Sequence, residues 1–134
     1  MIIQLDMKST IPIYVQLRNQ IVLGIGSGNL KLGENLPTVR QLASDIGVNN
    51  MTVSKAYGIL KQEGFIETDR RNGAKIAISK TSLNQHYFEE KIESELKLLI
   101  TEAKLSGCSN DEILIAVKTL MEEVRISDLE GVYL

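Results

Sequence analysis

The residues of this chain best suited to a chemical task lie between positions 40 and 55, and most of them are polar. An asparagine can pair with the edge of adenine, a threonine or methionine can touch the methyl group of thymine, and lysine or arginine can bind guanine or phosphate. Such a set suits the reading of a DNA duplex. The residues that we expect to contact DNA here are Arg40, Asn49, Asn50, Met51, Thr52, Ser54 and Lys55.

Two short helices joined by a glycine-containing turn must position these side chains. Thr38-x-x-Gln41 predicts a capping box at the start of the first helix. Gly47 is placed to end that helix in a left-handed conformation, and Asn49 or Asn50 then caps the second. This is the pattern of a helix-turn-helix.

The second helix has one apolar face and one open face. The residues expected in its core-facing stripe recur at helical spacing and are Val53, Ala56, Tyr57 and Leu60. With 3.6 residues per turn, Met51, Ser54, Lys55 and Gly58 then point outward. In a helix-turn-helix, the N-terminal part of this second helix lies nearest the bases.

A hairpin is predicted directly after these helices. Ile66–Thr68 and Ala74–Ile78 have strand character, and Asn72-Gly73 is a strong signal for a hairpin turn. Arg70, Arg71 and Gly73 lie at its tip, where arginines of a DNA-binding wing can contact phosphates.

Each of these side chains also has a purely structural interpretation. The two asparagines can be only cap and turn residues, and Ser54 with Lys55 can be a solvated helix face. Arg40 can form a surface ion pair with Asp45, which contributes little. Charged residues such as those at the hairpin tip also commonly occupy solvated turns.

The charge of the chain is unevenly distributed. Residues 1–78 hold nine Lys/Arg and six Asp/Glu, a net +3, and residues 79–134 hold six and eleven, a net −5, which together give the formal −2 of the whole chain. The basic half can approach phosphates while the acidic half stays away from them.

Residues 83–134 predict two amphipathic helices, which we expect to form an antiparallel hairpin. A capping box at Ser82-x-x-Gln85 begins the first helix and another at Ser109-x-x-Glu112 begins the second. The run Ile113–Val117 is apolar at every position, which is more than one stripe and favours a partner. The predicted dimerisation residues are Phe88, Ile92, Leu96, Leu99, Ile113, Val117, Leu120 and Val124. The alternative is that this tail packs on its own domain.

Several classes of protein and site are disfavoured. One histidine, His86, and one cysteine, Cys108, form no metal-ligand cluster or catalytic pair, so we expect no enzyme, metal or cofactor. Neither a membrane span nor a signal peptide is predicted, and a lone cysteine fits a reducing cytoplasm. Some fifty residues of tail leave little room for a large effector pocket.

The order and spacing of several motifs carry a resemblance to a known family. The motifs are Pro12-Ile13-Tyr14-x-Gln16, Gly33-x-x-Leu36-Pro37, Arg40-x-Leu42-Ala43, Gly47-Val48, Asn49-x-x-Thr52-Val53-x-Lys55-Ala56-Tyr57 and Glu63-Gly64-x-Ile66. They resemble the GntR family of bacterial winged-helix transcription factors, and the recognition helix looks like that of its short YtrA-type subgroup. The match covers residues 6–78 closely.

The resemblance implies a mainly α, α+β fold: a winged helix-turn-helix domain over 1–78, a linker over 79–82 and a helical dimerisation tail over 83–134. It places Arg40, Asn49, Asn50, Thr52 and Lys55 at family DNA-contact positions and Gly73 at the wing glycine. The wing departs from the family's usual Gly-x-Gly-Thr, since it reads Arg71-Asn72-Gly73-Ala74, and Met51 replaces what is often a polar residue.

The function that follows is sequence-specific regulation of transcription, with repression expected. The partners would be double-stranded DNA with a palindromic operator and a second copy of the chain. The resemblance also suggests control of a transporter operon. The rival interpretation is a winged-helix module that binds protein instead of DNA.

Overall fold

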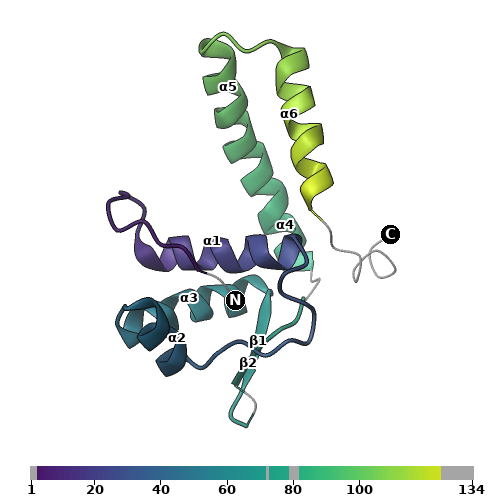
Figure 1. The fold of residues 1–134 in the computed structure, drawn as a ribbon. Helices are drawn as coiled ribbons and strands as arrows, with labels where there is room; N and C mark the ends of the chain where they lie inside the picture. The colour runs from purple at the N-terminus through teal and green to yellow at the C-terminus, as the bar shows by residue number, and fades with distance from the viewer. Residues whose placement is uncertain (1–2, 72, 79–81, 125–134) are drawn as a thin grey trace. The chain divides into compact units, whose positions relative to one another are not determined.

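The chain forms two compact units, one within residues 1–79 and one within residues 80–124. The computed structural model describes residues 3–71, 73–78 and 82–124 (Figure 1). The expected fold class, mainly helical with a small antiparallel sheet, is confirmed.

The first unit is built from three helices and a hairpin: α1 (Ile13–Gly26), α2 (Val39–Ile46), α3 (Asn50–Glu63), β1 (Ile66–Asp69) and β2 (Gly73–Ile76). Helices α1 and α2 both pack against α3, and the hairpin follows α3 (Figure 1). The largest fully buried side chains are Leu17, Ile21, Val53, Leu60 and Ile76. All four residues predicted for the inner stripe of α3 are buried, so its opposite side is the exposed one.

The turn between α2 and α3 has the predicted local structure. Both hydrogen bonds of the Thr38–Gln41 capping box are present at the start of α2. Gly47 ends α2 with φ of 74°, a left-handed conformation that favours glycine. Of the two candidate caps of α3, Asn49 is the one used, since its Oδ1 accepts a hydrogen bond from the N–H of Thr52 at 2.9 Å.

The hairpin strands pair antiparallel, with Ile66 opposite Ile76 and Asp69 opposite Gly73. Strand β2 spans Gly73–Ile76 and ends two residues before the predicted Ile78. One residue further along, the N–H of Ala77 still donates to the carbonyl oxygen of Phe65, just before β1.

The loop before α2 adds to the free edge of β2. Gly33 N–H donates to the Ile76 carbonyl oxygen at 2.7 Å, and Leu36 N–H donates to the Ala74 carbonyl oxygen at 2.8 Å. The N–H of Ile76 in turn donates to the carbonyl oxygen of Glu34 at 2.8 Å. These bonds hold the wing against the segment that leads into α2.

Two glutamines of α1 hold the N-terminal segment. Gln16 accepts from the N–H of Asp6 at 2.9 Å and donates to the Asp6 carbonyl oxygen at 3.0 Å. One turn further along, Gln20 makes the same pair of bonds with the backbone of Gln4. The side-chain amides thus make the pairs of hydrogen bonds to this backbone that a neighbouring β-strand would make.

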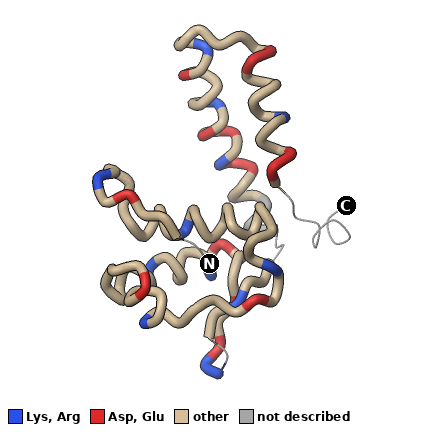
Figure 2. The backbone as a smooth tube through the Cα atoms, viewed as in Figure 1, with Lys and Arg blue, Asp and Glu red and all other residues tan. Residues whose placement is uncertain are grey.

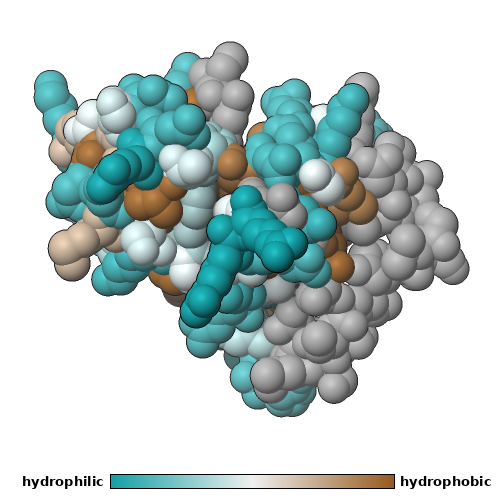
Figure 3. Space-filling view, turned by 90° about the horizontal axis from the view of Figure 1, so that it is seen from below, coloured by the Kyte–Doolittle hydropathy of each residue, from teal (hydrophilic) through white to brown (hydrophobic). Residues whose placement is uncertain are grey.

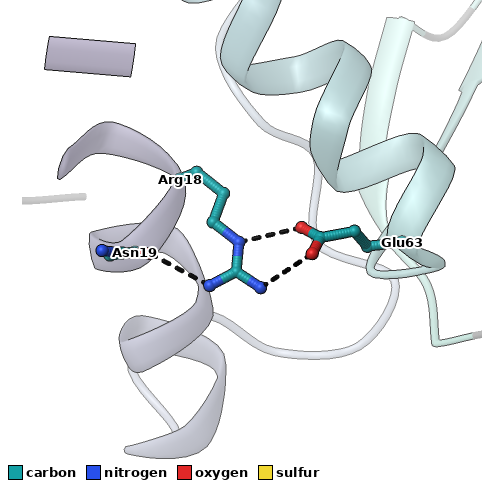
Figure 4. A network of polar contacts seen from close by, with 3 residues as sticks. All are labelled: Arg18, Asn19 and Glu63. Atoms are coloured by element: carbon teal, nitrogen blue, oxygen red, sulfur yellow. Dashed lines mark hydrogen bonds and ion pairs between the residues drawn. The ribbon is translucent and has the colours of Figure 1, made fainter. Parts of the chain in front are cut away.

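An ion pair joins α1 to the end of α3 (Figure 4). Arg18 binds Glu63 through two hydrogen bonds, from Nε to Oε1 at 2.8 Å and from Nη2 to Oε2 at 3.1 Å. Both side chains are largely buried, with exposed fractions of 14% and 13%. The Nη1 atom of Arg18 donates to Oδ1 of Asn19 at 3.0 Å. The Arg18 guanidinium also lies 5.6 Å from the centre of the Phe65 ring. This two-bond geometry is specific to arginine.

The second unit is a helical hairpin. Helices α4 (Ser82–Lys91), η1 (Ile92–Leu96) and α5 (Lys97–Leu105) follow one another directly, and α6 (Asn110–Glu123) runs back beside α5 (Figure 1). The turn has Gly107 at φ of 98°, and the predicted Ser109–Glu112 capping box is present. The η1 segment is a π-helical turn, which the apolar spacing does not predict. The expected Ser82–Gln85 capping box lies outside the described side chains.

Candidate nucleic-acid interface

The outer side of α3 is open to solvent. Asn50, Met51, Ser54, Lys55 and Gly58 are all exposed, and Thr52 on the flank is half-buried. Met51 is 80% exposed. An apolar side chain presented in this way has the chemistry to contact a thymine methyl group.

The two asparagines at the start of α3 differ in what they can offer a base. The Oδ1 atom of Asn49 accepts from both the N–H and the hydroxyl of Thr52, at 2.9 and 3.0 Å. Pairing with adenine needs the oxygen and the NH₂ group together. Asn49 therefore has mainly its NH₂ group available, whereas Asn50 is exposed and makes no side-chain hydrogen bond within the described residues.

Arg40 lies in the first turn of α2 and is exposed. Within residues 3–71, 73–78 and 82–124 it forms no ion pair with Asp45, the structural alternative considered for it. Its guanidinium is thus available to an anionic partner. In a helix-turn-helix the first helix crosses the DNA backbone, which suits an arginine at this place.

Lys55 does not extend freely from α3. Its Nζ atom lies 4.0 Å from the centre of the Tyr14 ring, in the first turn of α1. This is a cation–π contact. Tyr14, part of the Pro12-Ile13-Tyr14-x-Gln16 motif, is half-buried against the core and in contact with Lys55.

The wing presents its charges at its tip. Arg70, Arg71 and Gly73 are exposed, and the N–H of Arg71 donates to the Asp69 carboxylate at 2.8 Å, which shapes the turn. Gly73 has φ of 70°. Figure 3 looks at the molecule from the side of the wing, where hydrophilic side chains protrude. Asn72 lies outside the described residues.

A buried tyrosine sets the position of α3 against α2. The Tyr57 hydroxyl donates to the carbonyl oxygen of Pro37 at 2.7 Å, and burial raises the pKa of Tyr57 to about 12. The phenol is therefore neutral at physiological pH. This bond connects the inner face of α3 with the residue just before the α2 cap.

The tail carries acidic and basic residues along both of its helices (Figure 2). Its large apolar side chains are mostly exposed. No described residue of this unit is buried. Leu99 and Leu120 are 63% and 60% exposed. Of the other predicted dimerisation residues, Ile92, Leu96, Val117 and Val124 are exposed and Phe88 and Ile113 are half-buried.

Among the described residues, no group of His, Cys, Asp and Glu could hold a metal ion. In the same part of the chain, no helix has both the length and the apolar character needed to cross a bilayer. Cys108 is exposed as a free thiol in the turn of the tail hairpin.

A helix-turn-helix with an open second helix, followed by a β-hairpin wing, defines the class of winged helix-turn-helix DNA-binding proteins. The family model "Bacterial regulatory proteins, gntR family" matches residues 13–76. The chain is 38% identical over 124 residues to the HTH-type transcriptional repressor YtrA of Bacillus subtilis, across 92% of this chain and 95% of that protein. It belongs to the GntR family and is a DNA-binding transcriptional regulator, not an enzyme.

Two solved structures extend this comparison. One is a transcriptional antiterminator from Listeria monocytogenes EGD-e, which matches with a TM-score of 0.81 and 30% identity over 93% of this chain and 94% of that one. The other is YtrA from Sulfolobus acidocaldarius, a GntR-family transcription factor, with a TM-score of 0.54, 38% identity and coverage of 91% and 98%. The resemblance to the YtrA-type subgroup is thus confirmed.

Proposed function

We propose that this regulator binds a palindromic operator as a homodimer and represses the genes beside it. The observation that carries the proposal is the open outer side of α3, where exposed polar groups and Met51 stand opposite a fully packed inner side. Repression is supported by the name of the Bacillus subtilis relative. Control of a transporter operon stays a prediction from the family resemblance. Action in the cytoplasm stays a prediction from the lone cysteine and the absence of a predicted signal peptide or membrane span.

Base contacts in this proposal come from the start of α3. Asn50 is the better adenine reader because its amide is not used as a cap, while Asn49 contributes through its NH₂ group. Met51, Thr52 and Ser54 line the same end of the helix. Each good two-bond contact discriminates against a wrong base by about 1–3 kcal/mol.

Phosphate contacts come from the surrounding cations. Arg40 on α2, Lys55 on α3 and Arg70 with Arg71 on the wing are exposed, and Gly73 keeps the wing turn in its left-handed conformation. These contacts provide affinity without reading sequence, and they make binding sensitive to salt.

Dimerisation is supported by the apolar surface of the tail. Side chains such as Leu99, Leu120 and Met121 are more than half exposed on a hairpin that buries none of its described residues. Covering this surface with a second hairpin makes a four-helix unit. Two recognition helices can then reach successive major grooves about 34 Å apart.

The test is selection of bound duplexes from a randomised DNA pool, with the mass of the free protein measured by sedimentation. We expect an inverted repeat whose half-sites are about 10 base pairs apart and a particle of twice the 14.9 kDa chain mass. Enrichment of a single unrepeated site by a monomer contradicts the dimer. No enrichment at all contradicts the choice of operator DNA as the partner.

A further inference from the structure

The contact between Lys55 and Tyr14 connects the recognition helix with α1. Tyr14 sits in the first turn of α1, and the next two turns of that helix hold Leu17 and Ile21, which are fully buried. The ring is therefore fixed to the core of the unit. Lys55 itself is exposed, and its ammonium lies over this ring at 4.0 Å from the centre.

The ring orders Lys55 without neutralising it. Among the described residues no carboxylate forms an ion pair with Lys55, so its charge is not cancelled. A lysine side chain that is free in solution loses rotamer entropy when it binds. A lysine already held over an aromatic face has lost part of that freedom before DNA arrives.

The position of the ammonium also selects its target. By helical spacing Lys55 leaves α3 on the outward side, but contact with α1 draws its charge toward the flank of the helix. When a helix lies in the major groove, the sugar–phosphate strands pass along its flanks, while the bases face its outer end.

We propose that Tyr14 is a positioning residue for DNA binding, whose ring holds the ammonium of Lys55 where it contacts a backbone phosphate. This rests on the proposed function, because the phosphate is that of the operator. Tyr14 acts through Lys55, and the ring is the part of Tyr14 that matters.

The experiment measures operator affinity by fluorescence anisotropy over a range of salt concentrations, with the duplex recovered in the selection above. Tyr14→Leu removes the ring, Tyr14→Phe keeps it, and Lys55→Met removes the charge. We expect Tyr14→Leu to bind about two- to ten-fold more weakly, the effect of having to order one long side chain on binding, and Tyr14→Phe to bind like the parent protein.

The salt dependence and the double variant separate positioning from other roles. Lys55→Met should lower the slope of log affinity against log salt by about 0.9, the value for one phosphate. Tyr14→Leu should keep the slope, because the charge is still present. In the Lys55→Met background, Tyr14→Leu should cause no further loss.

Three results overturn the proposal: Tyr14→Leu binding as tightly as the parent or tighter, Tyr14→Phe as weak as Tyr14→Leu, or additive losses in the double variant. If Tyr14→Leu does not fold, Tyr14→Met makes the same comparison with a longer apolar side chain.

A measurement without DNA keeps this proposal distinct from the proposed function. The Cε protons of Lys55 should show an upfield ring-current shift in the NMR spectrum of the parent and of Tyr14→Phe, and lose it in Tyr14→Leu. No shift in the parent refutes the contact even when operator binding is normal. If the protein instead shows the upfield shift of the Lys55 protons and yet selects no duplex, the proposed function is wrong, and so is the role of Tyr14 in DNA binding.

Discussion

The hydroxyl of Tyr57 donates a hydrogen bond to the carbonyl oxygen of Pro37 at 2.7 Å. Tyr57 lies on the inner face of α3, and Pro37 directly precedes the cap of α2. The bond therefore fixes the start of one helix against the middle of the other. It keeps Arg40, at the start of α2, in a constant relation to the outer side of α3.

Removal of this hydroxyl should destabilise the domain without changing its surface. Tyr57→Phe keeps the ring in the core but loses the donor, so the free energy of unfolding should fall by about 0.5–1.5 kcal/mol. Urea denaturation followed by circular dichroism measures the change. An unchanged midpoint would mean that water replaces the bond at no cost.

The same residue predicts how stability depends on alkaline pH. Burial raises the pKa of Tyr57 to about 12 from its ordinary value of 10.0, so the folded state favours the neutral phenol. The corresponding stability is fully present below pH 10 and is lost as the pH rises through about 12. We expect the stability advantage of the parent over Tyr57→Phe to shrink across this window. A constant difference in urea denaturation between pH 9 and pH 12 contradicts the raised pKa.

Asn49 offers a way to separate the cap from DNA binding. Asn49→Ala should lower the free energy of unfolding by about 1 kcal/mol, because Oδ1 no longer accepts the N–H of Thr52. Asn49→Asp keeps an acceptor and places a negative charge at a helix start, so folding should be preserved.

The same carboxylate should repel phosphates, so Asn49→Asp should fold like the parent and bind operator more weakly. Thermal melting and a gel shift, run on both variants, provide the comparison. Equal operator affinity for Asn49→Asp and the parent indicates that the start of α3 stays away from the DNA.

The tail contains a closely matched pair of leucines. Leu98 and Leu99 are 62% and 63% exposed, but they are successive residues of α5 and so point in different directions. Only Leu99 shares the stripe of Leu96 and Ala103. Leu99→Asp should give a monomer with reduced operator affinity, whereas Leu98→Asp should stay dimeric. Sedimentation measures the mass. A dimeric Leu99→Asp variant and a monomeric Leu98→Asp variant would show that the interface lies on the face of α5 that contains Leu98.

Short-range features of this fold could be predicted from the sequence. The capping boxes at Thr38 and Ser109 involve residues three apart, and Gly47 takes its left-handed conformation for local steric reasons. The buried stripe of α3 follows from the helical spacing of its apolar residues alone. These signals do not depend on how the helices are arranged in space.

Contacts between distant segments could not be predicted in this way. Arg18 meets Glu63 across 45 positions, and Lys55 meets Tyr14 only because α1 crosses α3 at that place. An arginine and a glutamate within helices look like two solvated charges until the crossing is known. For the same reason the outward lysine could be found from the sequence, but the ring beneath it could not.

The central claim, that the outer side of α3 docks on DNA, is tested most directly by the methionine methyl groups. The chain has four methionines, of which Met51 lies on α3 and Met121 on α6 of the tail. With ¹³C-methyl labelling, addition of the selected operator should shift the resonance of Met51 strongly and leave that of Met121 nearly in place, and Met51→Leu assigns the signal. A complex that shifts Met121 and leaves Met51 unmoved contradicts the account.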